Sequence, residues 1–464
     1  MKKYLPAVLL LAIIFITACG RSTQPEYEAP VQPVRELTPY VPTPTQPLIP
    51  VAQPPTFPVI EIATDTHPFH MPRTTWHDGT VVIDGWESHA RVRGRGNTTW
   101  IYGEEKRPLR LRFTQPTYLL DFPTPHRDWI LLANHFDRSL LRNHGAMHLA
   151  GQLHGMYFTP RSQFVNLYIN GNYYGIYELT DERNQDLGRA NLRQNIDPTL
   201  SEFFIELNGH ARYFPPDEQA EVAFVVNDMY YEMRWPSGPY HLAYANQYIS
   251  AVSQAIRSGN ITALNQLIDI PSFIDFYIVQ ELFKNGDIGG FSVFMQIRGQ
   301  GMNRRLHMGP VWDFDQSSGN TSLVENPLNP IAARDNYWFR YLMEIPQFKQ
   351  AVNWRWEEIR NNQLPQTINH LQDIATQYQD NFNRNFYAFP YIMGDLFEWN
   401  WVQSYATAAL PTFQAQVDFL IDYLETRAMW MDHYLTQRLP DLDTRMALQQ
   451  SLAGHLASWL PLFF

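Results

Sequence analysis

Two aspartates, Asp287 and Asp313, stand just outside the two ends of a predicted β-hairpin. Apolar and other side chains nearly alternate over residues 291–298, two glycines and an asparagine fall within residues 299–303, and residues 306–312 form a second apolar stretch. This pattern is typical of two strands joined by a turn. A hairpin returns the chain to its starting end, so the two aspartates are expected to lie close together although twenty-five residues separate them. Two neighbouring carboxylates are suited to serve one metal-bound substrate.

The motif Asp313-Phe314-Asp315 adds a second carboxylate directly after the apolar return strand. Carboxylates suit hard cations such as Mg²⁺. Phosphoryl transfer needs an acidic residue that holds the metal on the phosphates, and commonly another that orients or deprotonates the attacking hydroxyl. Asp313 is the candidate for the first role and Asp287 for the second. Taken alone, such Asp-Gly clusters are more often loop and turn formers, and that interpretation stays open at this point.

Composition limits the classes of partner. The 464 residues exceed one ordinary core, so two packed lobes rich in aromatic side chains are expected. The formal charge is −11, and the sequence contains no Lys/Arg-rich run. A nucleic-acid partner is therefore not expected.

The single cysteine, Cys19, marks an export signal. Lys2 and Lys3 precede an apolar stretch over residues 7–16, which is short for a membrane-spanning helix. Residues 16–19 resemble the lipobox of bacterial lipoproteins, which implies cleavage before Cys19 and lipid attachment to it. We expect an extracytoplasmic protein anchored to the cell membrane or the outer membrane. An ordinary signal peptide or membrane anchor is the alternative.

The rest of the chain divides into a tether and two regions of different periodicity. Eleven of the 34 prolines fall between Pro25 and Pro58, so residues 20–58 are predicted to be an extended, disordered tether. Residues 59–181 are predicted to form an α+β lobe, and residues 182–464 a mostly helical lobe that carries the hairpin 287–315. The expected strands are 59–62, 80–83, 109–113, 164–169, 173–179, 203–207 and 222–226. The expected helices are 139–153, 243–256, 272–284 with Ser272 opening a capping box, 351–361, 368–386 and 413–434.

Four stretches carry a family resemblance. They are residues 95–113, which open with Arg-Gly-Asn and continue to Lys-Arg-Pro-Leu-Arg-Leu-Arg-Phe; residues 129–143; residues 168–181, around Asn-Gly-Asn; and residues 309–315. In order and spacing they resemble the CotH family of spore-coat-type atypical protein kinases. The resemblance spans about residues 59–320.

The resemblance implies a two-lobed, protein-kinase-like fold, with a small mixed sheet lobe and a larger helical lobe that bind ATP and Mg²⁺. The acceptors would be serine or threonine hydroxyls of a protein. By the same resemblance, Asp287 is the catalytic aspartate, and Asp313 and Asp315 are the metal-binding residues. The basic residues expected near the nucleotide are Arg95, Lys106, Arg107, Arg112 and Arg142.

Departures from the family pattern keep a second hypothesis open. Ser292 stands where the family usually has asparagine, and Arg107 and Arg112 stand where lysines are common. Neither a His-Arg-Asp loop nor a P-loop is present. A lipid-anchored exported protein also meets little ATP. The chain is therefore predicted to be either a kinase acting on an envelope or surface partner, or a weakly active or inactive binding module for such a partner. The acceptor and the oligomeric state stay open.

Three further patterns in the sequence each have a functional and a simpler interpretation. His144 and His148 are spaced for one helix face and could ligate a metal, although an ordinary structural pair is the favoured interpretation. The aromatic stretches 387–391 and 399–401 could stack on sugars or peptides, but packing explains them more simply. An Asp-x-Asp motif also occurs in metal-dependent glycosyltransferases, which have no place for the other matching stretches.

Overall fold

A computed structural model describes residues 56–67, 70–101, 103, 106–328, 333, 337–393 and 404–436. The chain divides into two units, residues 1–53 and 54–464, and all described residues belong to the second. The predicted export signal, Cys19, nearly all of the tether and residues 399–401 lie outside the described residues. Phe57, at the end of the predicted tether, is buried and stacks on Tyr378, so the folded unit includes it.

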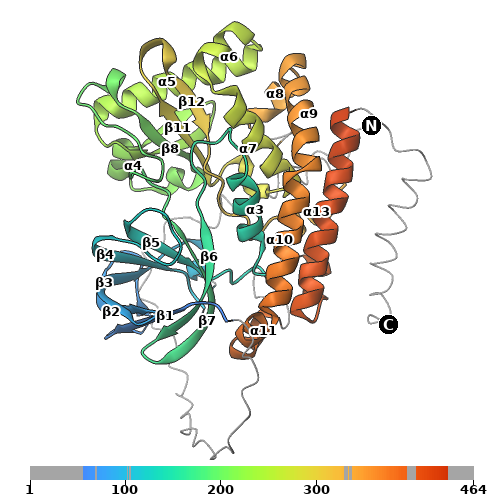
Figure 1. Ribbon diagram of the computed structural model, residues 1–464. Helices are drawn as coiled ribbons and strands as arrows, with labels where there is room; N and C mark the ends of the chain where they lie inside the picture. The colour runs from blue at the N-terminus through green and yellow to red at the C-terminus, as the bar shows by residue number, and fades with distance from the viewer. Residues whose placement is uncertain are drawn as a thin grey trace, which may run out of the picture. The chain divides into compact units, whose positions relative to one another are not determined.

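Seven strands close into a barrel in the order β1-β2-β3-β4-β5-β7-β6 (Figure 1). All neighbours are antiparallel except β1 and β6, which are parallel, so the sheet is mixed as predicted. Inward-facing side chains such as Ile60, Leu111 and Phe113 fill the interior. The strands are β1 (Val59–Thr64), β2 (His77–Ile83), β3 (Trp86–Gly94), β4 (Leu109–Thr117), β5 (His126–Leu132), β6 (Ser162–Ile169) and β7 (Asn172–Asp181).

The predicted Asn-Gly hairpin is confirmed as β6–β7. Asn170 and Gly171 both have positive φ, 51° and 77°, as a two-residue turn of this kind requires. Strands β3 and β5 were not predicted.

Helix α3 (Arg142–Gly151) lies between β5 and β6 in sequence but does not belong to the barrel core. Its buried residues Ala146, Leu149 and Ala150 join the cluster that includes Phe276 of α7 and Leu371 of α10. The prediction of a helix in this part of the chain was correct. Its apolar face packs against helices that come later in the chain.

A second sheet of five antiparallel strands carries the predicted hairpin, in the order β12-β11-β8-β10-β9. Its strands are β8 (Phe203–Leu207), β9 (Ala223–Val226), β10 (Met229–Trp235), β11 (Val293–Arg298) and β12 (Arg305–Met308). The return strand was predicted to reach Trp312 but ends at Met308. Pro310 has no N–H to donate to a ladder, and the last hydrogen bond runs from Gly309 N to Phe294 O at 2.9 Å. Asp313 therefore lies on an irregular segment beyond the sheet edge.

Helices make up most of the remaining described chain, and α9, α10 and α13 run side by side (Figure 1). The α-helices besides α3 are α2 (Thr98–Ile101), α4 (Pro216–Val222), α5 (Pro239–Ser258), α6 (Ile261–Leu267), α7 (Ile270–Leu282), α8 (Phe339–Leu342), α9 (Pro346–Asn361), α10 (Gln363–Gln377), α11 (Gln379–Ala388), α12 (Tyr405–Ala408) and α13 (Phe413–Thr436). The 3₁₀ turns are η2 (Pro198–Leu200), η3 (Gly209–Tyr213), η4 (Gly286–Gly289), η5 (Gly301–Asn303) and η7 (Pro390–Ile392). Among the described helices, none is both long and apolar enough to span a membrane.

Two helix predictions need correction. The cap of α7 is Asp269, whose Oδ1 accepts the N–H of Ser272 at 2.9 Å, so Ser272 is inside the first turn instead of capping it. The helix predicted over residues 368–386 is divided at Tyr378 into α10 and α11. The α+β class itself is confirmed by the barrel, the second sheet and the helices.

Candidate active site

The structure connects the segments of Asp287 and Asp313 through Asn285. Asp287 lies in η4, after α7 and the short segment that includes Asn285, and Asp313 follows β12. Asn285 Oδ1 accepts the N–H of Asp287 at 3.1 Å, while Asn285 Nδ2 donates to the carbonyl of Asp313 at 3.2 Å. The hydroxyl of Ser292 donates to Asp313 Oδ2 at 2.9 Å. The two ends of the hairpin therefore form one half-buried acidic site.

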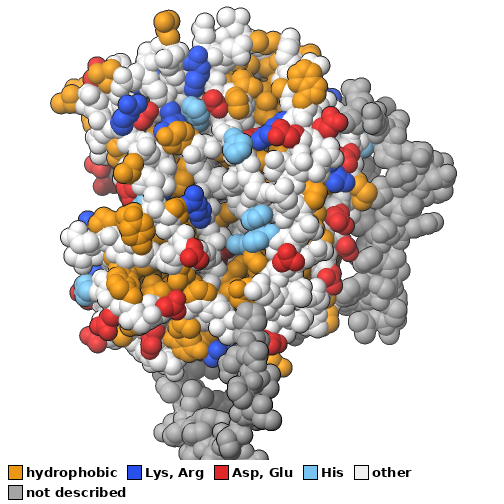
Figure 2. Space-filling view, in the orientation of Figure 1, with side chains coloured by type: hydrophobic (Ala, Val, Ile, Leu, Met, Phe, Trp, Pro, Cys, Tyr) orange, Lys and Arg blue, Asp and Glu red, His pale blue; other side chains and the backbone are white. Residues whose placement is uncertain are grey.

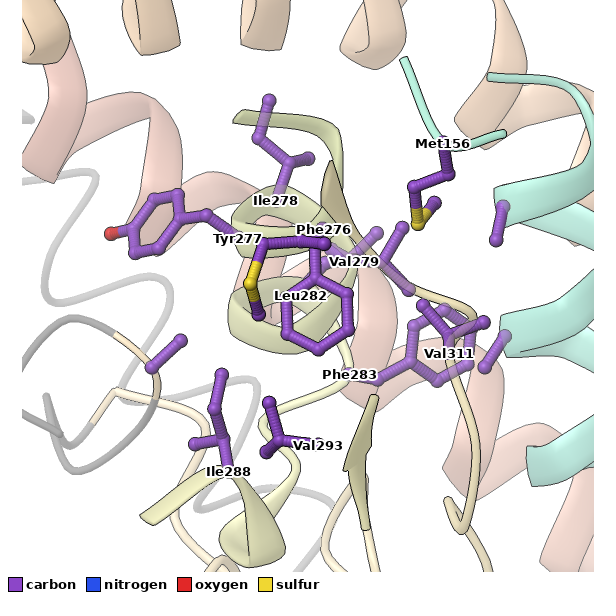
Figure 3. Packing of buried hydrophobic residues seen from close by; sticks show 14 of the residues in the cluster. Met156, Phe276, Tyr277, Ile278, Val279, Leu282, Phe283, Ile288, Val293 and Val311 are labelled. Carbon is purple, nitrogen blue, oxygen red and sulfur yellow. The ribbon is translucent and has the colours of Figure 1, made fainter. Parts of the chain in front are cut away.

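Buried apolar residues anchor the segments that carry these groups. Ile288 follows Asp287, Val293 follows Ser292, and Val311 comes two residues before Asp313; all three belong to the cluster around Leu282 and Phe283 (Figure 3). Each of these three anchors is at most 1% exposed. The acidic site therefore lies on loops whose adjacent residues are fixed by close packing.

The backbone of the site is strained at two residues. Asp313 has φ 68° and Ser292 has φ 52°, in the left-handed region that residues other than glycine rarely adopt. Such a conformation costs about 1–3 kcal/mol and persists only where the surroundings enforce it. Here Phe314 N donates to Asn143 Oδ1 of α3 at 2.7 Å, which fixes the segment immediately after Asp313. The two residues with a strained backbone, Ser292 and Asp313, are therefore the two whose side chains are hydrogen-bonded to each other.

Burial and like charge raise the pKa of the acids. Burial, with a further contribution from Asp313, raises the pKa of Asp287 to about 8. Burial also raises the pKa of Asp315 well above its ordinary value, and the charges of Asp313, Asp287 and Asp137 add to that. A group of carboxylates that resist ionising together is stabilised by a bound cation.

The donor set suits a cation that takes only a few protein ligands. Within the described residues, no group of three or more His, Cys, Asp or Glu side chains is arranged to hold a metal ion. Mg²⁺ commonly takes one or two carboxylates and completes its shell with water and substrate phosphates. Asp313 is half-buried and fits this role, whereas Asp315 is only 6% exposed and lies deeper.

Among the predicted basic residues, Arg95 lies close enough to Asp313 and Asp315 for their charges to affect its pKa. Its guanidinium lies over the ring of Trp312, 5.6 Å from the centroid. Burial lowers the pKa of Arg95, and the charges of Glu182, Asp313 and Asp315 oppose that effect. Arg183, which the sequence did not single out, lies over the same ring at 4.0 Å. Two arginines therefore lie over the ring of Trp312, the residue directly before Asp313.

The other predicted basic residues of the barrel have different surroundings. Lys106 is fully buried, donates to the carbonyl of Ala133, and lies over the ring of Tyr177; burial lowers its pKa to about 7. Arg107 lies over the ring of Trp100 at 4.8 Å. Arg112 forms an ion pair with Asp128 at 2.7 Å on the outer face of the barrel.

Arg142 is completely buried, and its contacts lie on segments next to the acidic site. It pairs with Asp137 at 2.5 Å, and its guanidinium donates to the carbonyls of Ser317 and Ser318 at 3.1 and 3.2 Å. A guanidinium with no exposed surface has no face left for a nucleotide. We therefore reassign Arg142 from nucleotide contact to positioning: it ties the start of α3 to the segment that follows Asp315.

The histidine pair of α3 is extended by a third histidine. His144 Nε2 lies 2.9 Å from His370 Nε2 of α10, and the His148 ring stacks on His370 with centroids 3.9 Å apart. Histidine side chains gather on the surface where α3 and α10 meet (Figure 2). Burial lowers the pKa of His148 to about 3 and that of His370 to about 4, so both rings are neutral near pH 7. The pair therefore fits the structural interpretation, as an interface between two helices.

Of the aromatic stretch 387–391, Phe389 is buried and Tyr387 is exposed.

A family model described as CotH kinase protein matches residues 91–431. The match covers more than half of the chain and includes Arg95, Asp287, Asp313 and the helices through most of α13. The chain therefore belongs to the CotH family. A search of curated proteins found no match.

Proposed function

We propose that this chain is an ATP- and Mg²⁺-dependent kinase that phosphorylates serine or threonine hydroxyls of an envelope or surface protein. The observation that carries the proposal is the joining of Asp287 and Asp313 through Asn285 at the two ends of the β11–β12 hairpin. Membership of the CotH kinase family supports it. The family also favours a kinase-like, two-lobed arrangement, with the barrel as the small lobe.

Each acidic residue has a chemical role in the proposal. Asp287 orients the acceptor hydroxyl and takes up its proton; a base with a pKa near the working pH suits that task. Asp313 holds the metal, with Asp315 behind it, and Arg95 offsets phosphate charge. Magnesium would be held by Asp313 and would supply positive charge that offsets the negative charge developing during transfer. Asn285 and Asn143 keep the segment of Asp313 in place.

The test is transfer of label from γ-labelled ATP to a serine-containing protein acceptor. The proposal predicts labelling that needs Mg²⁺ and stops when EDTA is added. Labelling that persists in EDTA would contradict the proposed metal, and no labelling with any acceptor in Mg²⁺ would favour the binding-module alternative.

The location is a further proposal. Cleavage before Cys19 and lipid attachment to it would hold the kinase at the membrane surface, with the residues between Cys19 and Phe57 as the spacer. The partner is then an envelope protein or surface-assembly protein. Labelling of the chain with radioactive palmitate, lost in Cys19→Ala, checks this expectation.

The observation that favours a weakly active kinase is Ser292. The family asparagine would offer an amide oxygen, whereas the Ser292 hydroxyl is donated to Asp313 Oδ2. A hydroxyl is a poorer ligand than an amide or carboxylate oxygen for a hard cation. A pseudokinase that binds nucleotide without efficient transfer is therefore the second candidate function.

We expect Ser292→Asn to strengthen Mg²⁺ binding. Asparagine tolerates the φ of 52° better than serine and adds an amide oxygen beside Asp313. If that ligand contributes about 1.4 kcal/mol, half-maximal labelling needs about tenfold less Mg²⁺. Ser292→Gly is the matched control, because glycine relieves the same backbone strain without adding a ligand. Equal Mg²⁺ requirements for the asparagine and glycine variants would contradict the ligand role.

We expect Mg²⁺ to stabilise the protein more at pH 8.5 than at pH 6. The folded pKa of Asp287 is raised to about 8, above the roughly 3.9 of an unfolded aspartate. The folded state therefore retains a proton that the unfolded state loses, and the free energy of unfolding falls as pH rises from about 4 to about 8. A cation next to Asp287 competes with that proton, so Mg²⁺ binds more tightly as pH rises toward 8. Thermal unfolding with and without Mg²⁺ measures the difference. In Asp287→Asn, the increase in Tm caused by Mg²⁺ should depend much less on pH. An equal increase at pH 6 and pH 8.5 in the unmodified chain would contradict this prediction.

A further inference from the structure

Four arginines form a ladder on the outer face of the barrel. Arg91 and Arg93 lie on β3, and they are directly opposite Arg112 and Arg110 of β4. Opposed residues of an antiparallel pair point to the same face of the sheet. Their neighbours in sequence, such as Val92 and Leu111, point into the barrel core. We call these four residues the arginine ladder.

One indole lies against the whole ladder. The ring centroid of Trp76 is 5.6 Å from the guanidinium of Arg91, 4.7 Å from that of Arg93, 5.9 Å from that of Arg110 and 4.6 Å from that of Arg112. Like charges placed opposite each other destabilise a sheet, and contact with an aromatic face offsets part of that cost. The indole holds the guanidiniums together without neutralising them.

The carboxylates nearby only partly balance this charge. Asp128 pairs with Arg110 and Arg112, and Glu182 pairs with Arg110 at 3.2 Å. Asp78 is opposite Arg91 in the sheet but lies 3.3 Å from His89. The guanidinium of Arg73 is bound away from the ladder, to Gly96 O and Asn97 Oδ1. Four arginines against three carboxylates, one of which pairs with His89, leave a positive surface on a chain of formal charge −11.

One end of the arginine ladder is exposed to solvent, and the other end lies near residues that contact the acidic site. Arg91 is exposed, and no carboxylate of the described residues lies within ion-pair distance of it. At the other end, Arg110 contacts Glu182, the neighbour of Arg183, whose guanidinium covers Trp312. Arg91 is four residues before Arg95, which is roughly 13 Å along a strand. The outer end of the ladder is therefore separated along the chain from Arg95, the arginine that lies over Trp312 directly before Asp313.

We infer that the arginine ladder is a docking surface for acidic side chains of the acceptor polypeptide. The inference rests on the proposed kinase function, because it assigns the ladder to that acceptor. Guanidiniums bind carboxylates and phosphates through paired hydrogen bonds, so glutamate, aspartate or phosphoserine in the acceptor all fit. Arg112, placed near the nucleotide by family resemblance, is thereby reassigned to the acceptor. Acidic residues at some distance from the phosphorylated hydroxyl would then decide which serine or threonine is used.

Binding of two fluorescent peptides to the full chain, purified in detergent, tests the inference without ATP. Each peptide carries one serine, flanked by glutamates in one peptide and by glutamines in the other. The unmodified chain should bind the glutamate peptide more tightly, and Arg91→Glu should weaken that binding about tenfold or more. Arg257→Glu is the matched control, because Arg257 is also exposed and lies over one aromatic ring, that of Tyr341, at 5.1 Å. This control should leave both affinities unchanged.

The same variants, assayed for labelling, separate the inference from the kinase proposal. If the unmodified chain labels both peptides with equal KM and Arg91→Glu changes neither value, the docking surface is wrong and the kinase stands. If the chain binds the glutamate peptide but transfers no phosphate to it, the proposed kinase function is wrong. The assignment of the arginine ladder to a phosphate acceptor is then wrong as well. An increase in the KM for ATP in Arg91→Glu, with peptide binding unchanged, overturns the inference in favour of a nucleotide contact. Loss of binding to phosphatidylserine vesicles, without any peptide preference, overturns it in favour of a membrane surface.

Discussion

Asp287→Asn is expected to lower the rate of phosphate transfer on the order of 10²- to 10⁴-fold, the usual contribution of a positioned general base. Asparagine keeps the size of the side chain but cannot take up the acceptor proton. Asp313→Asn is expected to abolish Mg²⁺-dependent labelling as well, because it removes the half-buried carboxylate that fits the metal. Initial rates with γ-labelled ATP, measured over a range of Mg²⁺ concentrations, check both results.

Folding and catalysis can be separated in these variants. Asp287→Asn removes one member of a group of like charges, so its Tm near pH 8 should not fall below that of the unmodified chain. Asp418→Asn, an exposed aspartate on α13, is the control for the change of residue type. Labelling that survives in both Asp287→Asn and Asp313→Asn would remove the proposed chemistry from this site.

Arg142→Met is expected to cost about 3–5 kcal/mol in the free energy of unfolding. The substitution leaves the buried carboxylate of Asp137 without its ion-pair partner, and it removes the hydrogen bonds to the carbonyls of Ser317 and Ser318. Arg360→Met is the matched control, because Arg360 pairs with Asp432 at 3.2 Å where both side chains are partly exposed. Such a surface pair contributes about 0–1 kcal/mol. Denaturant unfolding of the two variants measures the difference.

The same experiment tests the reassignment of Arg142. If Arg142→Met is as stable as Arg360→Met but binds ATP more weakly, Arg142 contacts the nucleotide and the positioning role is wrong. A large loss of stability, together with disturbed activity, fits an arginine that supports the segment following Asp315.

The sequence predicted an element correctly where a few neighbouring residues alone determine the backbone conformation. The turn at Asn170-Gly171 specified the β6–β7 hairpin, because few other residue pairs accept positive φ at both positions. Strand β3 was missed because most of its outward positions are charged or polar, and only neighbours such as Ala90 and Val92 are buried. The break between α10 and α11 at Tyr378 has no glycine or proline to announce it. These features depend on packing partners that are distant in sequence.

Residue types located the acidic site, but they could not show how its side chains are held. Hairpin geometry was enough to bring Asp287 to Asp313. The bond from Ser292 to Asp313, and the link through Asn285, depend on a backbone conformation that spacing does not reveal. Arg142 and Arg112 were selected as basic residues, yet burial and local ion pairs give them different surroundings. Arg183 belongs to no recognisable motif and reaches the site only because the fold brings it over Trp312.

The most direct measurement is a crystal structure of the chain with Mn²⁺ in place of Mg²⁺ and a non-hydrolysable ATP analogue. Anomalous scattering locates the cation independently of the protein. We expect a Mn²⁺ peak on the carboxylate of Asp313, with the terminal phosphate between it and Asp287. A cation and nucleotide bound elsewhere, with Asp287 and Asp313 contacting neither, would contradict it.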